Sequence, residues 1–199
     1  ILMAGRGPRV IAGEFGGMRL STPRGDRTRP TSDRVKESLF AALGQRVVNA
    51  RVLDIYSGCG ALAIEALSRG AQSAVCVERD SNALKSIATN IESARVSDRL
   101  AVRGRAVEPY LADPTGGAGA DGPFDLVFAD PPYETSNGVI GDHLRAILSH
   151  GALASGGAVV IERSSGSEAL VEPGWDVTWS RTYGDTLLMV LEPLQESTQ

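Results

Sequence analysis

Residues 51–63 read RVLDIYSGCGALA, and this stretch decides the fold. A short apolar run passes through Gly58 and Gly60 directly into a segment with apolar residues at helical spacing. Glycines in such a turn adopt backbone conformations closed to other residues, and the helix that follows offers unpaired amide groups to a ligand. The stretch therefore predicts a strand, a tight turn and a helix of an α/β sheet, with a ligand close to the turn.

The rest of the chain repeats this alternation of strand and helix, which is typical of a parallel sheet covered by helices. The last two strands are separated only by Tyr183 and Gly184, a spacing that suits an antiparallel hairpin and excludes a crossover helix. The Gly-rich stretch 114–123 is expected to be a mobile surface loop. Strands are expected at 51–55, 73–78, 100–103, 124–129, 158–162, 176–182 and 185–191, and helices at 61–68, 81–94 and 138–149. The predicted class is α/β, with a Rossmann-like, mostly parallel seven-stranded sheet that ends in an antiparallel hairpin.

A basic segment precedes this sheet. Residues 1–36 carry eight basic and three acidic side chains, a charge of +5, which leaves −9 for the rest of a chain whose net charge is −4. Short strands at 9–12 and 18–21 predict a small hairpin, and Thr31 or Ser32 can cap the helix that follows. We therefore expect residues 1–30 to form a basic β-hairpin arm that meets a polyanion, and residues 31–199 to form the main domain.

Composition limits the possible classes of function. The 199 residues are 42% apolar and 22% charged, which is typical of one soluble globular domain. No apolar run approaches the roughly 20 residues that span a bilayer, and the first residues lack the blocks of a signal peptide, so we expect a cytoplasmic protein without a membrane partner. The cysteines, Cys59 and Cys76, and the histidines, His143 and His150, lack the spacing of metal ligands, so no metal is expected.

Asp54 and Glu78 indicate which ligand the glycine turn holds. The turn also fits a dinucleotide site when it is read only as G-x-G-x-x-A with an acid about 20 residues further on. A nicotinamide-dependent oxidoreductase therefore remains an alternative on this pattern alone. Asp54, however, lies four residues before Gly58, where its charge would repel a pyrophosphate and attract a cation. S-adenosylmethionine carries an ammonium group and a sulfonium centre. We therefore predict this cofactor, with Asp54 at its amino acid end and Glu78 accepting the ribose hydroxyls.

A second motif, FDLVFADPPY at residues 124–133, places an acid, two prolines and an aromatic ring at the end of a buried strand. Ligands of open α/β sheets bind at this edge, and the prolines hold Asp130 and the neighbouring carbonyls rigidly. The amine of a nucleic acid base is a weak nucleophile because its lone pair is delocalised into the ring. Acceptors from Asp130 and Pro131 would orient this amine and localise its lone pair, while Tyr133 stacks on the base. The motif therefore predicts methyl transfer to a base amine.

Further stretches extend this pattern over nearly the whole chain, at residues 9–13, 16–20, 29–40, 54–60, 65–71 and 130–133. With them, the sequence resembles the RsmD family, bacterial methyltransferases that modify a guanine N2 in 16S ribosomal RNA. The resemblance implies a class I methyltransferase fold and S-adenosylmethionine as the cofactor. It implies cofactor binding by Asp54, Ser57, Gly58, Gly60, Glu78 and Ala106, and an amine-methylating motif made of Asp130, Pro131, Pro132 and Tyr133.

The leading hypothesis is methylation of a specific guanine N2 in small-subunit ribosomal RNA, either free or in an assembling 30S particle. An unstacked loop base would enter beside Tyr133. The nearest alternative is a DNA adenine-N6 or cytosine-N4 methyltransferase, because the motif presents those amines equally well; a non-enzymatic RNA-binding assembly factor is more distant. Phosphates would be held by arginines of the arm, namely Arg9, Arg19, Arg24, Arg27 and Arg29.

Overall fold

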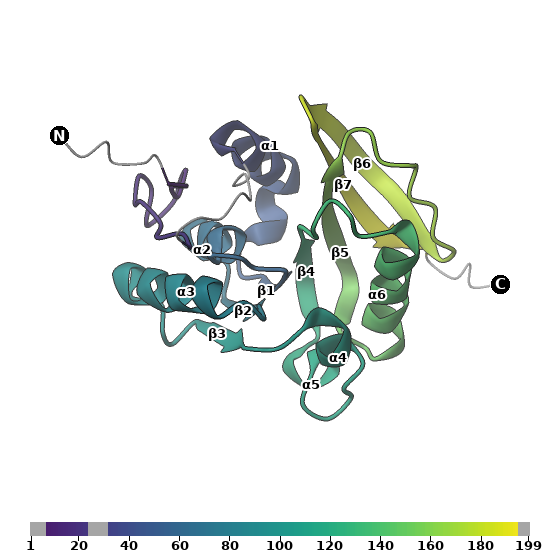
Figure 1. Ribbon diagram of the computed structural model, residues 1–199, viewed down its shortest axis with the longest axis horizontal. Coiled ribbons are helices and arrows are strands. Elements are labelled where there is room, and N and C mark those ends of the chain that lie inside the picture. Colours follow the sequence, from purple (N-terminus) through teal and green to yellow (C-terminus); the bar gives the residue numbers. More distant parts are fainter. Residues whose placement is uncertain (1–6, 24–31, 195–199) are drawn as a thin grey trace.

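Seven strands form one sheet in the order β3-β2-β1-β4-β5-β7-β6 (Figure 1). The computed structural model describes residues 7–23 and 32–194. Strands β1 to β5 run parallel to one another, whereas β7 pairs antiparallel with both β5 and β6. The strands are β1 (Arg51–Ile55), β2 (Ser73–Val77), β3 (Leu100–Arg103), β4 (Phe124–Ala129), β5 (Leu153–Ser164), β6 (Trp175–Tyr183) and β7 (Thr186–Pro193). The predicted α/β class and the predicted C-terminal hairpin are therefore confirmed.

Six α-helices lie in the described part of the chain, and none of them is long and apolar enough to cross a membrane. Helix α1 begins after Ser32, whose side chain accepts a hydrogen bond from the backbone N–H of Val35 and so acts as the predicted N-cap. The helices are α1 (Asp33–Leu43), α2 (Ala61–Ser68), α3 (Ser81–Ala94), α4 (Val107–Leu111), α5 (Ala118–Asp121) and α6 (Asn137–Ser149), with a 3₁₀ turn η1 at Gly44–Val47.

The stretch 114–123 is not simply the surface loop that its composition predicts. Helix α5 lies within it, and Ala118 at the start of this helix is fully buried. Asp121 accepts two hydrogen bonds from the guanidinium of Arg103, at 2.9 and 2.7 Å, and one from the hydroxyl of Tyr110, at 2.9 Å. The mobile-loop prediction is wrong for this half of the stretch, because long-range polar contacts hold residues that composition alone marks as flexible.

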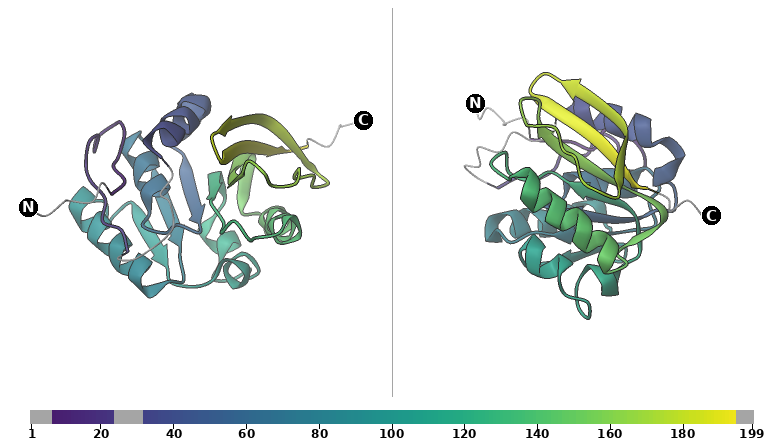
Figure 2. Two further views of the ribbon diagram at one scale, coloured as in Figure 1. Left: turned by 45° about the horizontal axis from the view of Figure 1, so that its top comes forward. Right: turned by 90° about the vertical axis from the view of Figure 1, so that its right-hand side faces the viewer.

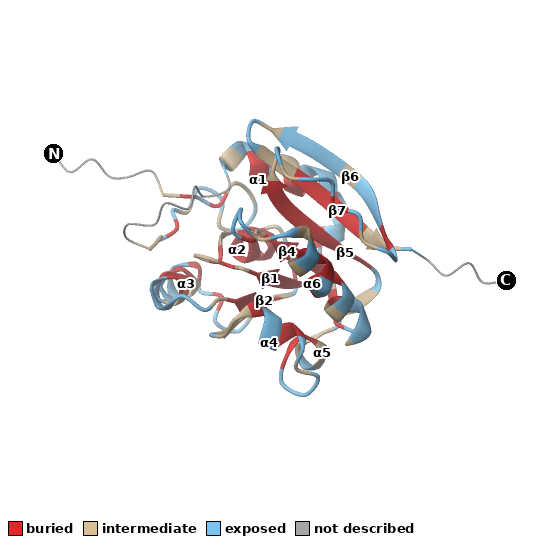
Figure 3. Cartoon of the chain, turned by 45° about the vertical axis from the view of Figure 1, so that its right-hand side comes forward, coloured by how far each residue is buried: buried red, intermediate tan, exposed pale blue. Residues whose placement is uncertain are grey.

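The helices cover the two faces of the sheet as separate layers (Figures 1 and 2). Side chains alternate along each strand, so Val52 packs in the core beneath α1, α2 and α3, while Leu53 packs in the core beneath α4, α5 and α6. The central strands are buried on both faces, whereas β6 at the edge of the sheet is mostly exposed (Figure 3). By this alternation, Asp54 belongs to the face covered by α1, α2 and α3.

The described part of the N-terminal arm packs against this first layer of helices. Its two predicted strands reduce to one antiparallel bridge between Arg9 and Arg19, with Val10 and Leu20 buried in the core. The carboxylate of Glu65 on α2 accepts hydrogen bonds from the backbone amides of residues 11 and 12, at 2.7 and 3.2 Å. Backbone hydrogen bonds from Val10 to Met18, from Gly17 to Val10 and from Leu20 to Pro8 join the two segments, so the predicted hairpin is present in short form and side chains of the domain also hold it.

Candidate functional site

The two sequence motifs meet at one edge of the sheet. Strand β1 lies between β2 and β4, and its last residue, Ile55, pairs in register with Val77 and with Ala129. Glu78 and Asp130 directly follow these paired residues, so both acids lie at the carboxyl edge where β1 ends. The chain continues from β1 toward β2 and β3 on one side and returns with β4 and β5 on the other, which makes this edge a topological switch point.

The turn after β1 leaves its backbone open to a ligand. Tyr56, Gly58 and Gly60 all have positive φ values, of 71°, 54° and 79°. A Cβ atom added to Gly58 would meet no other atom within 4 Å, so space remains beside this part of the backbone. Gly60 precedes α2 without a side-chain cap, so the first amides of this helix have no side-chain acceptor from the capping position. The turn therefore combines open space with amide donors.

Ser57 holds the turn in place rather than facing the open space. Its hydroxyl donates to the carbonyl oxygens of Asp54 and Val77, at 2.5 and 3.2 Å, and its backbone N–H donates to the same carbonyl of Val77. These bonds connect the ends of β1 and β2. The side chain of Ser57 thus contributes to a cofactor site by fixing the turn, and its role as a direct ligand contact stays a prediction.

Asp54 is a buried carboxylate, with 2% of its surface exposed. The pKa of Asp54 is raised to about 7, mainly by burial; the hydrogen bond from the backbone N–H of Ala63, at 3.3 Å, opposes this shift, and the charge of Glu78 adds to it. A cation beside this carboxylate would favour its ionised form. Asp54 is therefore placed and tuned to receive a positive group.

The side chain of Glu78 is fixed by the backbone around it. One carboxylate oxygen accepts from the N–H of Gly58 at 2.9 Å, and the other accepts from the N–H groups of Arg79 and Asp80 at 2.7 and 2.8 Å. Each carboxylate oxygen can accept more than one hydrogen bond, and Glu78 is partly exposed. It can therefore still accept hydroxyl groups of a ligand at the rim of the turn.

Ala106 lies at the N-cap of α4, following β3, and is partly exposed. The neighbouring guanidinium of Arg105 is bound to Asp113 at 3.1 Å and to the carbonyl of Pro109 at 2.8 Å. These bonds hold the Arg105 side chain on its own loop. Ala106 then presents a small side chain at the start of a helix, which is compatible with a flat ring nearby but does not by itself identify one.

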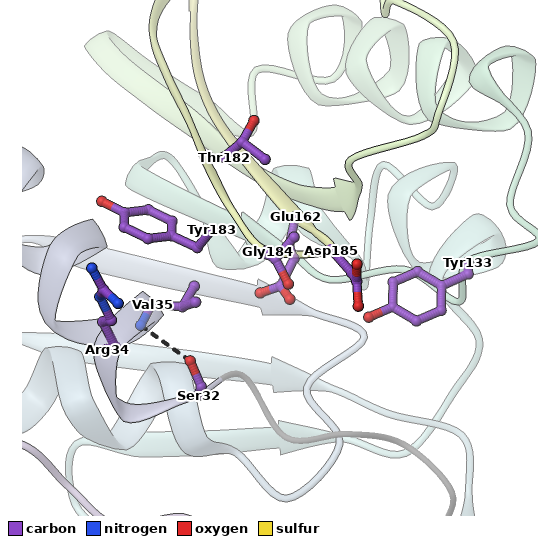
Figure 4. Close-up of a pocket in the computed structure, with 10 residues that line it drawn as sticks. Ser32, Arg34, Val35, Tyr133, Glu162, Thr182, Tyr183, Gly184 and Asp185 are labelled. Atoms are coloured by element: carbon purple, nitrogen blue, oxygen red, sulfur yellow. Dashed lines mark hydrogen bonds between the residues drawn. The ribbon is translucent and has the colours of Figure 1, made fainter.

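The acceptor motif follows β4 directly and borders a cavity of about 380 Å³. Pro131 is buried, whereas Tyr133 is 57% exposed and lines the cavity. The other lining residues come from the start of α1, the end of β5 and the turn between β6 and β7: Ser32, Arg34, Val35, Glu162, Thr182, Tyr183, Gly184, Asp185 and Thr186 (Figure 4). The motif is thus next to a space large enough for a small-molecule group.

Comparison with known proteins identifies the family. The model of the family described as conserved hypothetical protein 95 matches residues 8–192. Ribosomal RNA small subunit methyltransferase D of Escherichia coli is 32% identical over 154 residues, which cover 77% of this chain and 73% of that protein. This chain belongs to the RsmD family of ribosomal RNA methyltransferases. The predicted resemblance is therefore confirmed.

Two further proteins are similar to this member of the RsmD family. YlbH of Bacillus subtilis, provisionally named an rRNA methyltransferase, is 34% identical over 184 residues, covering 89% of this chain and 95% of YlbH. The solved structure of YhhF from Escherichia coli, provisionally described as a methyltransferase, has a TM-score of 0.81 at 28% identity and covers 94% of this chain and 97% of that one. The predicted Rossmann-like methyltransferase fold is confirmed, and the fold and family imply a methyl donor of the S-adenosylmethionine type.

The residues at the turn fit such a donor. Open backbone at Gly58 accommodates a nucleoside without a steric clash, the partly exposed carboxylate of Glu78 can accept ribose hydroxyls, and buried Asp54 can accept an ammonium group. A pyrophosphate would instead bring its negative charge toward two carboxylates, of which Glu78 already raises the pKa of Asp54. The donor set thus suits a cationic nucleoside better than a dinucleotide.

Two buried polar side chains, Lys36 and Asn90, join the arm to this site, and neither was predicted from the sequence. Lys36 on α1 is fully buried, and its ammonium group donates to the carbonyl of Arg9 and lies 3.9 Å from Glu65. The amide of Asn90 on α3 donates to the carbonyls of Ser21 and Cys59, at 3.0 and 2.9 Å. A charged residue in phase with the apolar face of α1 was the available signal for Lys36, whereas no local pattern marks Asn90.

Two of the predicted RNA-binding arginines lie in the described part of the arm. Arg9 and Arg19 are bridge partners, both are exposed, and Arg9 donates to Asp33 at 2.8 Å. Directly opposed residues of an antiparallel pair project from the same side, so the side chains of Arg9 and Arg19 leave the arm on the same side. The other three, Arg24, Arg27 and Arg29, lie outside the described residues.

Proposed function

We propose that this protein transfers a methyl group from S-adenosylmethionine to the exocyclic N2 of a guanine in small-subunit ribosomal RNA. One arrangement carries the proposal: the acceptor motif Asp130–Tyr133 lies at the same sheet edge as Asp54 and Glu78, and it borders a cavity. Donor and acceptor groups would therefore meet at the ends of β1 and β4. Membership of an rRNA methyltransferase family supports RNA as the substrate.

S-adenosylmethionine carries the methyl group on a sulfonium centre. When the amine nitrogen takes the methyl group, the carbon–sulfur bond breaks and the sulfur leaves as a neutral thioether. Asp54 would accept the ammonium group of this molecule, and Glu78 would accept its ribose hydroxyls. The glycine turn would exclude side chains from the space that the nucleoside needs. These residues bind and orient the donor, and none of them takes part in proton transfer.

The acceptor side would activate the amine. The carboxylate of Asp130 and the carbonyl of Pro131 would accept both amine hydrogens, which withdraws the lone pair from the ring and directs it toward the methyl carbon. Tyr133, exposed at the mouth of the cavity, would stack on the base. Asp130 would also stabilise the positive charge that the nitrogen gains with the methyl group, until the nitrogen loses its proton to solvent.

Residues 1–30 would act as an RNA-binding arm on the domain formed by residues 31–199. The bridge partners Arg9 and Arg19 support this role, because both are exposed and a guanidinium group suits the geometry of a phosphate. Phosphate contacts of this kind fix register on the RNA and carry little sequence information. The substrate would be ribosomal RNA, either free or within an assembling 30S particle.

The product nucleoside tests this function. Small-subunit RNA and 30S particles from cells that lack the gene are incubated with enzyme and S-adenosylmethionine, digested, and analysed by mass and retention time. We expect N2-methylguanosine with the wild-type enzyme, and none with Asp130→Asn, which keeps the shape of the side chain and removes its charge. N6-methyladenine or N4-methylcytosine would contradict the guanine assignment, and a methylated carbon would contradict the amine mechanism.

Binding of S-adenosylhomocysteine provides the control for folding. Asp130→Asn should retain nearly wild-type affinity in calorimetry, because Asp130 is proposed to contact the target amine rather than the cofactor. Loss of both binding and methylation would mean that Asp130 serves the fold, and retention of both would remove it from the mechanism.

A further inference from the structure

A second buried acid lies beside the acceptor motif. Glu162 near the end of β5 has 6% of its surface exposed and lines the cavity next to Tyr133. Ala129 of β4 pairs in register with Ile161 of β5. Asp130 directly follows Ala129 at the end of β4, and Glu162 directly follows Ile161 within β5. The two acids therefore occupy equivalent positions on adjacent segments of chain at the edge of the sheet.

The alternation of side chains along β5 fixes the face of Glu162, and the same alternation, continued one residue beyond β4, would turn Asp130 toward that face. Ala129 and Ile161 belong to the core beneath α4, α5 and α6, whereas the preceding pair, Phe128 and Val160, belongs to the core beneath α1, α2 and α3. Glu162, which follows Ile161 within β5, therefore faces the layer of α1, α2 and α3, and a residue that follows Ala129 in extended chain would face the same layer. The cavity lies on this side, since Ser32, Arg34 and Val35 of the α1 region form its opposite wall.

The cavity presents more than one carboxylate to whatever enters it. Glu162 and Asp185 both line it, and in Figure 4 their carboxylates lie between the ring of Tyr133 and the wall formed by Ser32 and Val35. Ionised carboxylates only accept hydrogen bonds. A ligand that enters beside Tyr133 would therefore gain hydrogen bonds where it offers donors to these acids.

Guanine is the base whose edge fits such a set. Its ring N1–H and its N2 amine are adjacent donors, whereas adenine places the acceptor N1 beside its amine and cytosine places the acceptor N3 there. A carboxylate that faces a ring acceptor gains no hydrogen bond and repels its lone pair. Adjacent acceptors at Asp130 and Glu162 thus correspond to adjacent donors of guanine.

We propose that Glu162 determines base specificity by accepting the N1–H of the target guanine while Asp130 engages its N2 amine. This inference rests on the proposed function, because it assigns a reader to the base whose amine is methylated. It also gives a physical reason for choosing guanine over the adenine and cytosine amines that the same motif could present.

Three single substitutions separate the charge of Glu162 from its packing. Glu162→Gln keeps the shape and removes the charge, Glu162→Asp keeps the charge and shortens the side chain, and Glu37→Gln makes the same charge change on an exposed residue of α1 that does not line the cavity. Each full-length variant is assayed for methylation of small-subunit RNA from cells that lack the gene, and for binding of that RNA and of S-adenosylhomocysteine.

We expect Glu162→Gln to lower kcat about 10- to 150-fold, the range of one hydrogen bond to a charged group. Glu162→Asp should retain more activity than Glu162→Gln, and Glu37→Gln should behave as wild type. Affinity for S-adenosylhomocysteine should be unchanged, and affinity for RNA should change less than about twofold, because phosphate contacts supply most of it.

The opposite order of the two variants would overturn the proposal. If Glu162 only fills space or joins β5 to its neighbours, Gln should be tolerated better than Asp, since it has nearly the same volume. Loss of S-adenosylhomocysteine binding in both variants would likewise assign a structural role. A wild-type enzyme that makes no N2-methylguanosine would refute the proposed function itself, whereas wild-type activity in Glu162→Gln would refute only the role of Glu162.

Discussion

Asp54→Asn tests the electrostatics of the turn, because it removes one ionisable group and keeps its shape. Burial raises the pKa of Asp54 to about 7 in the folded protein, from an ordinary value of 3.8. The folded state therefore holds this proton more tightly than the unfolded state. Protonated Asp54 therefore contributes to the free energy of unfolding, and this contribution is fully present below pH 3.8 and is lost as the pH rises through about 7. A shift of roughly 3 pH units corresponds to about 4 kcal/mol, at about 1.36 kcal/mol per unit.

Urea unfolding of the cofactor-free wild type and of Asp54→Asn at several pH values measures this effect. The free energy of unfolding of the wild type, relative to the variant, should fall by roughly 2.5 kcal/mol between about pH 5 and pH 8, as the buried carboxylate is forced to ionise. Other titrating groups are common to both proteins, so the difference isolates Asp54. Parallel curves over this range would show that Asp54 ionises as it does in water.

Ligand affinity should depend on pH in the opposite direction. The ammonium group of S-adenosylhomocysteine favours the ionised form of Asp54, so affinity for the wild type should rise through about pH 7 and then level off. Asp54→Asn should bind more weakly and show no such rise. An affinity that is independent of pH in the wild type would place the ammonium group elsewhere.

Three further changes test the fold and the acceptor site. Lys36→Met should lower the free energy of unfolding in urea by about 1–3 kcal/mol, because it leaves the carbonyl of Arg9 without its donor while Glu65 keeps its ion pair with Arg69; an unchanged value would contradict this. Gly13→Ala should destabilise more than Gly17→Ala, although both have φ of +87°, because only at Gly13 would the new Cβ lie 1.8 Å from a backbone carbonyl oxygen of α2; equal thermal shifts would contradict this. Tyr133→Ala should lower methylation about 5- to 150-fold, whereas Tyr133→Phe retains it; equal loss in both would exclude stacking.

Much of the fold was predictable because its signals are local. The run from β1 through the glycine turn into α2, and the two-residue separation before the last strand, each specify their geometry within a few residues. The sequence predicts a strand only at 158–162, whereas β5 extends from Leu153 to Ser164. This extra length could not be predicted, because the pairing of β5 with β4 shifts register between Phe124 and Leu126, and residues 153–157 include two glycines that weaken a strand signal. Helix α5 likewise depends on contacts made by Asp121 with distant residues.

In the candidate site too, the residues marked by local sequence could be predicted, and those placed by distant contacts could not. Asp54, Glu78 and Asp130 could be proposed from sequence, since each lies within one residue of the end of a strand and parallel strands end at a common edge. The position of Glu162 beside Asp130 depends on the register of β4 with β5, which the sequence does not specify. Lys36 and Glu65 are buried together only because the arm covers them, so their pairing could not be predicted from either helix alone.

The arm and the cofactor turn share structural support, and this bears on how RNA binding should be separated from catalysis. Asn90 bonds to both the backbone of Ser21 in the arm and the carbonyl of Cys59 in the glycine turn. Removing the arm would also expose the charges of Lys36 and Glu65 and open the core at Val10. A truncated protein would therefore lose the geometry of the turn together with its RNA contacts. Surface arginines such as Arg19, whose side chains lie outside this shared support, are the positions at which the two functions can be separated.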